Sequence, residues 1–117
     1  NDVNCYNDHL VSCKKARLSL VDEGSTFVYQ VLGIKQDKCE VKVTLVDMPP
    51  ETDPEAASLF EGKSMNCMLE LNSDFNTEIL PYCSGPLKEA IYEFTLQKIY
   101  NILAQSLGDI LTELRKV

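Results

Sequence analysis

Apolar and polar residues alternate along much of the first half of the chain, which is the pattern of β-strands. The alternation is clearest over residues 39–45, where every second residue is apolar and those between are polar. Residues 16–20 and 64–71 alternate in the same way, and residues 27–34 are rich in aromatic and β-branched side chains. Short polar turns separate the first three segments. The pattern therefore predicts an antiparallel sheet of about four strands.

The end of the chain has the period of a long amphipathic helix that follows Ser84-Gly85-Pro86. Apolar residues recur there at steps of four and three and form what we call the apolar stripe: Tyr92, Leu96, Ile99, Leu103, Leu107, Ile110 and Leu114. The helix that follows Pro86 would be about 45 Å long, whereas the strands reach only about 25 Å. We therefore expect the stripe to be buried against the sheet, with the helix extending beyond it.

Two shorter helices are also predicted. Apolar residues at helical spacing follow Asp2 over residues 2–13. Asp53-Pro54-Glu55 has the order of a capping residue, a first helical residue and an acid that the helix dipole favours. Gly62 would end this second helix.

Together the elements predict an α+β fold, in which the long C-terminal helix packs on one face of the antiparallel sheet. The length of 117 residues is that of one domain. We divide this domain, residues 1–117, into an N-terminal segment (1–15), the sheet with a short helix insertion (16–71) and the C-terminal helix (84–117).

The C-terminal helix carries apolar residues outside the stripe as well. Leu87, Ile91, Phe94 and Ile102 cluster on a second side of it. If the sheet covers the stripe, these four residues remain for a protein partner or a second copy of the chain. They are the candidate interface.

The net charge of −7 limits the classes of partner. Residues 87–117 are neutral overall, so the whole acidic surplus lies in residues 1–86. Nucleic-acid binding needs a basic face, and anionic membranes also attract basic segments, so both are disfavoured. No apolar run approaches the length of a membrane span.

The five cysteines indicate an oxidising compartment. They are widely spaced, with no Cys-x-x-Cys pair of the kind found in zinc ribbons and dithiol redox proteins. Such cysteines are typical of structural disulfides, which persist outside the cytosol. We therefore expect a periplasmic or secreted protein whose export signal is already removed, the alternative being a cytosolic protein with buried cysteines.

Strand order suggests the disulfide pairing. In a meander, the start of the first strand and the start of the third lie at the same end of the sheet, which brings Cys13 near Cys39. Cys67 faces the side on which the helix after Cys83 must dock. We predict Cys13–Cys39 and Cys67–Cys83, with Cys5 outside both. Four cysteines allow three connectivities, and Cys39–Cys67 is the next candidate.

Three short motifs resemble those of small exported bacterial Cys-containing proteins of uncharacterised function. They are Tyr29-x3-Gly33-x5-Cys39, Gly62-Lys63-x-Met65-x-Cys67 and Cys83-x-Gly85-Pro86. The resemblance covers roughly residues 13–86. It implies export and a set of four cysteines with Cys5 as the odd one, and it implies no catalytic residues.

Two groups of residues have the chemistry of a site. Cys5, His9 and Cys13 are spaced four apart and are good zinc or copper ligands. A straight helix separates the first and last of them by about 12 Å, and a fourth ligand is missing, so we expect no metal. Cys83 at a helix N-terminus has the setting of a reactive thiolate, but Leu87 stands where a resolving cysteine would be. A disulfide that anchors the helix is the favoured role of Cys83.

We therefore predict an extracytoplasmic, disulfide-stabilised protein-binding domain without catalytic activity or cofactors. The alternative is a carrier of a small apolar ligand or lipid, with a pocket between the long helix and the sheet. A thiol-redox protein that uses Cys83 is the third interpretation.

Overall fold

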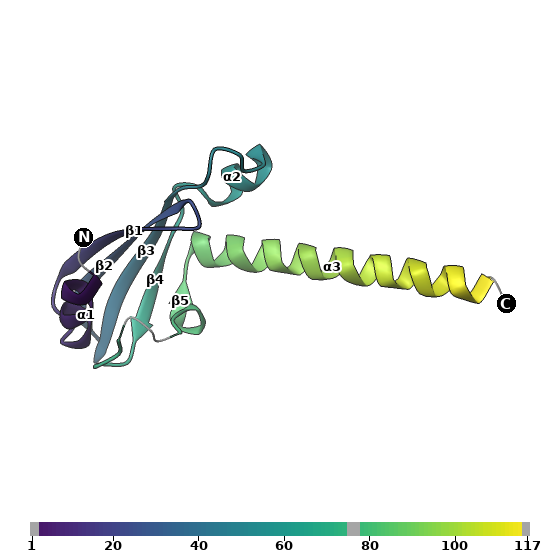
Figure 1. Ribbon diagram of the computed structural model, residues 1–117. Helices are drawn as coiled ribbons and strands as arrows, with labels where there is room; N and C mark the ends of the chain where they lie inside the picture. The colour runs from purple at the N-terminus through teal and green to yellow at the C-terminus, as the bar shows by residue number, and fades with distance from the viewer. Residues whose placement is uncertain (1–2, 75–77, 116–117) are drawn as a thin grey trace.

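A computed structural model describes residues 3–74 and 78–115, with side-chain surroundings as far as Gly108 (Figure 1). Helices and strands follow one another in the order α1 (Val3–Val11), β1 (Ala16–Asp22), β2 (Ser25–Lys35), β3 (Lys38–Asp47), α2 (Pro54–Phe60), β4 (Ser64–Leu69), the 3-10 turn η1 (Leu80–Tyr82), β5 (Cys83–Ser84) and α3 (Pro86–Arg115).

The sheet is an antiparallel meander with the strand order β1-β2-β3-β4-β5. The α+β class and the long C-terminal helix are confirmed. The sheet has five strands, not about four. The additional strand, β5, is too short for alternation to reveal it, and it forms because Cys83 pairs with Cys67 of β4.

The core lies on one face of the sheet. Leu18, Tyr29, Val43 and Met65 are paired in register across β1 to β4, so their side chains line the same face. Leu18, Val43 and Met65 are buried and Tyr29 is half-buried. The first turns of α3 pack on this face, as do Tyr6 and Leu10 of α1. We call the sheet together with α1 and α2 the body.

The short helix α2 forms where the capping signals predict it. The carboxylate of Asp53 accepts a hydrogen bond from the backbone N–H of Glu55 at 3.2 Å, and Pro54 is the first helical residue. Gly62 follows the helix with a φ of +80°, a conformation that favours glycine. Phe60, at the end of α2, is buried.

The helix α3 leaves the body after its first turns and extends well beyond it (Figure 1). The radius of gyration is 18.7 Å, whereas a compact domain of this length has about 13 Å. Every residue from Thr95 to Gly108 is exposed. The expectation that the stripe packs along the sheet is therefore wrong for the described part of α3. In the described ranges, neither α3 nor a shorter helix is both long and apolar enough to cross a membrane.

Candidate interaction surface on the C-terminal helix

One side of α3 attaches the helix to the body. Leu87 and Ala90 are 1% and 3% exposed, and Ile91 and Phe94 are half-buried against the core. The ring of Phe94 packs edge-on against Phe60 of α2, with 5.5 Å between the ring centroids. Lys98 covers Phe94 further, with its Nζ 4.7 Å from the ring centroid. We call Leu87, Ala90, Ile91 and Phe94 the docked face.

The direction in which α3 starts is set by its connection to β4. The disulfide Cys67–Cys83 links β4 to β5, directly before the helix. Gly85 follows with a φ of +128°, and a Cβ at this position would lie 3.2 Å from the Cα of Met65. Lys88 donates a hydrogen bond from Nζ to the carbonyl oxygen of Cys83 at 2.8 Å. The base of α3 is therefore held tightly against β4.

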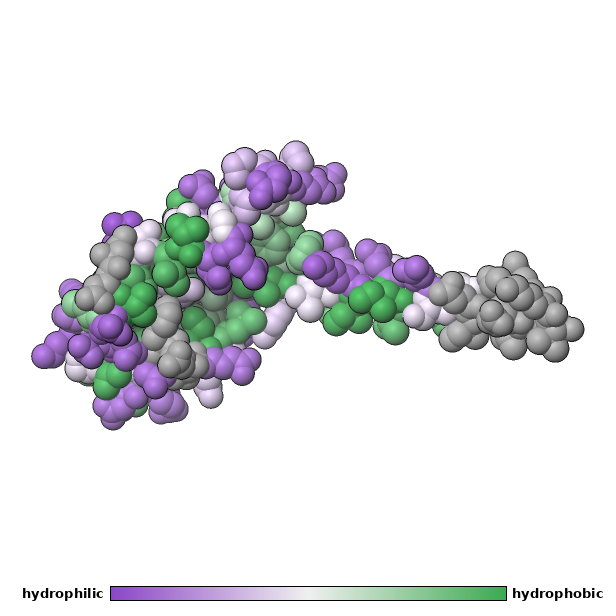
Figure 2. All heavy atoms as spheres, viewed as in Figure 1, coloured by the Kyte–Doolittle hydropathy of each residue, from purple (hydrophilic) through white to green (hydrophobic). Residues whose placement is uncertain are grey.

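The apolar stripe lies on the opposite side of α3. At 3.6 residues per turn, Leu96, Ile99 and Leu103 point roughly 180° away from Leu87, Ala90 and Phe94. The described stripe residues are all exposed, from 46% at Tyr92 to 65% at Leu96. Figure 2 shows apolar residues gathered along one side of the projecting helix and hydrophilic residues along the other. Because the docked face already turns toward the body, the body does not cover the stripe.

Two further apolar residues extend the stripe sideways. Tyr100 is 71% exposed and Ile102 is 63% exposed, and they lie on the two flanks. A shallow groove of about 640 Å³ on the Tyr100 flank is lined by α3 residues alone, among them Tyr92, Leu96 and Tyr100. Tyr100 is not among the residues predicted from the sequence. Its spacing of four residues from Leu96 was the signal that could have identified it.

The predicted candidate interface requires a correction. Leu87 is buried in the core, and Ile91 and Phe94 are half-buried against it, so these three residues attach the helix to the body. Ile102 alone of the four is exposed. Both sides of α3 are apolar. Helical spacing shows which residues share a side, but it does not predict which side packs against the body. Stripe positions 110 and 114 lie outside the residues whose side chains are described.

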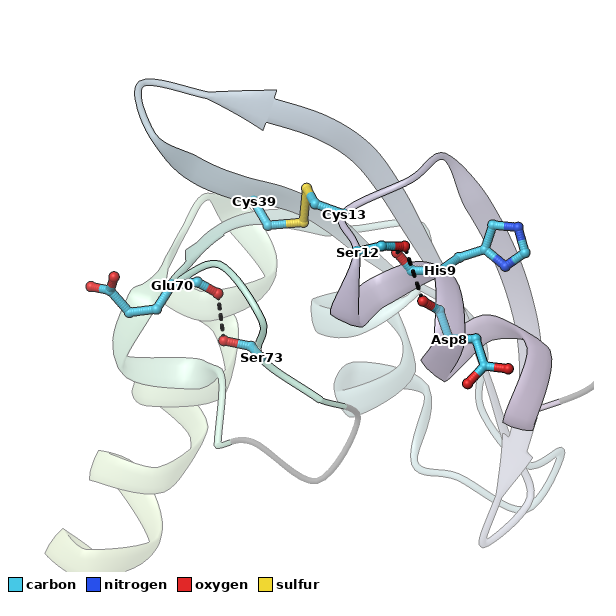
Figure 3. Close-up of a disulfide and its surroundings, with 7 residues drawn as sticks. All are labelled: Asp8, His9, Ser12, Cys13, Cys39, Glu70 and Ser73. Atoms are coloured by element: carbon cyan, nitrogen blue, oxygen red, sulfur yellow. Dashed lines mark hydrogen bonds between the residues drawn. A yellow bond between two sulfur atoms is a disulfide. The ribbon is translucent and has the colours of Figure 1, made fainter.

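Both predicted disulfides are present. Cys13–Cys39 joins the segment after α1 to the start of β3 (Figure 3), and Cys67–Cys83 joins β4 to β5. The alternative pair Cys39–Cys67 does not form. Cys67 and Cys83 are 0% and 5% exposed, which shields their sulfurs from attack by an external thiol. This burial disfavours a redox role for Cys83.

The Cys5–His9 pair lies on the exposed side of α1. Cys5 Sγ is 3.8 Å from His9 Nδ1, which also donates to the carbonyl oxygen of Cys5 at 2.8 Å. Cys13 is held in its disulfide, so the three residues spaced along α1 do not form a common ligand set. Within residues 3–74 and 78–115, no group of three or more His, Cys, Asp or Glu side chains is arranged to hold a metal ion.

A small cavity lies between α1 and the sheet. Its volume is about 260 Å³, and its lining includes Tyr6, Leu10, Tyr29 and Ile79. Burial raises the pKa of both tyrosines; for Tyr29 the nearby charge of Asp22 adds to the effect. Ligand pockets usually measure about 300–1,000 Å³. This cavity lies under α1, whereas the sequence-based alternative expected a pocket between the long helix and the sheet.

Comparisons with known proteins give no match: no family model matches the chain, and neither curated proteins nor solved structures contain a similar one. The function proposed below is therefore argued from the exposed residues of this chain alone.

Proposed function

We propose that this chain is an extracytoplasmic protein-binding domain that contacts its partner through the apolar stripe of α3. One observation carries the proposal: the stripe faces away from the body on a helix that projects beyond it. Large contiguous apolar surfaces on a soluble protein mark interaction sites.

The energetics of the projecting segment support the same proposal. Isolated helices gain little from propensity alone, and most helical stability in proteins comes from packing of the apolar side. From Thr95 to Gly108, α3 includes Asn101 and Gly108, both unfavourable in a helix interior. A partner that covers the stripe would provide the packing that the body does not.

The two disulfides support a location outside the reducing cytosol. All four bonded cysteines are buried, and the bonds join segments that are 26 and 16 residues apart in sequence, as structural disulfides do. The resemblance to small exported proteins supports the same compartment. We propose a periplasmic or secreted location on these grounds.

The test compares three forms of the chain: wild type, Leu96→Glu with Leu103→Glu, and Gln105→Glu. Gln105 is exposed on the side of α3 opposite the stripe and does not line the groove beside Tyr100, so its variant adds an acid without touching the stripe. Each form is used for affinity capture from an extracytoplasmic fraction and for sedimentation of the pure protein. We expect wild type and Gln105→Glu to bind a protein or to self-associate, and the double variant to do neither. If all three forms behave alike in both measurements, the proposal is wrong.

The second candidate function is carriage of a small apolar molecule in the cavity under α1. The observation that favours it is a lining that combines apolar side chains with two tyrosine rings, those of Tyr6 and Tyr29. A fluorescent fatty acid or a similar probe would test it. Binding that Leu10→Trp abolishes in a folded variant would support this function, and absence of saturable binding would exclude it.

A further inference from the structure

We infer that the partner on the stripe is a second copy of this chain, paired antiparallel along α3 with Leu103 at the two-fold axis. The inference rests on the proposed function, and it adds the identity of the partner and the geometry of the complex.

The spacing of the stripe is the same in both directions. From Tyr92 to Leu114 the steps are four, three, four, four, three and four, and they read identically from Leu114 back to Tyr92. In an antiparallel pair centred on Leu103, Ile99 therefore lies opposite Leu107 of the second copy. Leu96 lies opposite position 110, and Tyr92 lies opposite position 114. Such self-complementarity is what a two-fold symmetric interface requires.

The length of the projecting helix fits this register. With Leu103 at the centre, position 112 of one copy lies opposite Phe94 of the other, which is the last residue of α3 that packs on the body before the exposed segment begins. The pairing thus uses the free helix up to the body. The docked face, with Phe94 on Phe60, lies on the other side of α3 and is left undisturbed.

Charge favours the antiparallel over the parallel arrangement. The surplus of −7 lies wholly in residues 1–86, and residues 87–117 are neutral. A parallel pair would bring two acidic bodies together at the same end. An antiparallel pair separates them by about 27 Å of helix, well beyond a screening length of about 8 Å at physiological salt. The neutral helices approach one another without net repulsion.

The period of the stripe suits straight helices. From Leu96 to Leu107 it advances 11 residues in three turns, which is close to the natural period of an α-helix. The helix α3 is straight in Figure 1. Burial of about 100 Å² at each of the five described stripe positions on both copies gives about 1,000 Å². A biological interface buries at least about 1,000 Å².

Sedimentation equilibrium of the pure, disulfide-bonded chain tests the identity of the partner. We expect a dimer for wild type and for Gln105→Glu. For Leu103→Glu we expect roughly 100-fold weaker association, because the charge would meet its own copy at the axis. Circular dichroism of each variant verifies the fold of the body. A wild-type chain that stays monomeric at several hundred micromolar overturns this inference, whereas the proposed function is then decided separately by stripe-dependent capture of a different protein.

Cysteine pairing tests the orientation, in a Cys5→Ser background. We expect Ile99→Cys mixed with Leu107→Cys to give a cross-linked heterodimer, and Leu103→Cys to link to itself in either orientation. Tyr92→Cys alone should not link to itself, because the two copies of residue 92 lie at opposite ends of an antiparallel pair. Efficient self-linking of Tyr92→Cys would show a parallel pair and overturn the antiparallel register.

Discussion

Phe94 of α3 packs edge-on against Phe60 of α2, with ring centroids 5.5 Å apart and ring planes at 81°. In the part of α3 whose side chains are described, this contact is the furthest point at which the helix is partly buried against the core, since Thr95 and the residues up to Gly108 are exposed. Two positions further, Leu96 belongs to the stripe on the other side of the helix. Within one turn, α3 therefore passes from residues that pack on the body to residues that are exposed.

Phe94→Ala should destabilise the fold, because it removes the aromatic contact that α2 and α3 share. Phe94 is half-buried, so we expect a loss of about 1–3 kcal/mol in the free energy of unfolding. Leu96→Ala is the matched control and should change it by less than about 0.5 kcal/mol, because its side chain is 65% exposed. Urea unfolding at a protein concentration too low for association measures both. Equal losses would show that the stripe packs on the body after all.

Gly85→Ala should be among the more damaging glycine substitutions. Its φ of +128° is unfavourable for alanine, and the new Cβ would lie 3.2 Å from backbone atoms of Ser64 and Met65. We expect a loss of about 1–3 kcal/mol or more. Gly62→Ala, at a φ of +80° with open space around the Cβ, should cost less. Thermal melts of the two variants give the comparison, and a larger effect at Gly62 would contradict the close approach of Gly85 to β4.

Removal of the Cys13–Cys39 disulfide should release α1 from the sheet. The bond closes a chain segment with a sequence separation of 26 residues, and such a loop contributes about 3–4 kcal/mol. We expect Cys13→Ala with Cys39→Ala to lower the melting temperature and to increase amide exchange in α1. Cys5→Ser should leave both unchanged, because Cys5 is exposed and lies outside both disulfides. Protection of α1 that survives loss of the disulfide would show that Tyr6 and Leu10 suffice to hold it.

Alkaline solution should destabilise the fold through Tyr6. Burial raises the pKa of Tyr6 above its ordinary value of 10.0, with the neighbouring Tyr29 as the smaller cause. The folded chain therefore prefers the neutral phenol. This contribution to stability is complete below pH 10, the range where tyrosine in the unfolded chain is neutral, and it is lost as the pH rises further.

The measurement is urea unfolding of wild type and Tyr6→Phe between pH 8 and pH 11. The variant lacks the ionisable hydroxyl, so its free energy of unfolding should fall less steeply above pH 10. Parallel curves for the two proteins would show that Tyr6 does not contribute to the alkaline loss.

The sequence by itself predicted the first four strands of the sheet, the cap of α2 and, as the preferred of three connectivities, the two disulfides. Alternation over residues 39–45 predicts a strand because side chains on successive residues of an extended chain point to opposite faces. Asp53 and Pro54 start α2 through contacts with residues only a few positions away in the chain, so the local sequence is sufficient to predict this cap. A meander follows from short turns, and it places Cys13 and Cys39 at the same end of the sheet.

The tertiary structure alone decided which side of α3 is buried. Spacing shows that Leu87 and Leu103 lie on different sides of one helix, yet both sides are apolar, so periodicity does not rank them. The choice depends on the direction in which the chain leaves β5, which Gly85 and the Cys67–Cys83 bond set. It depends as well on Phe60, which α2 brings to Phe94 from 34 residues earlier in the chain. Contacts between such distant residues cannot be predicted from the local pattern of apolar residues. Because these contacts bury the Leu87 side of α3, the stripe on the opposite side is exposed.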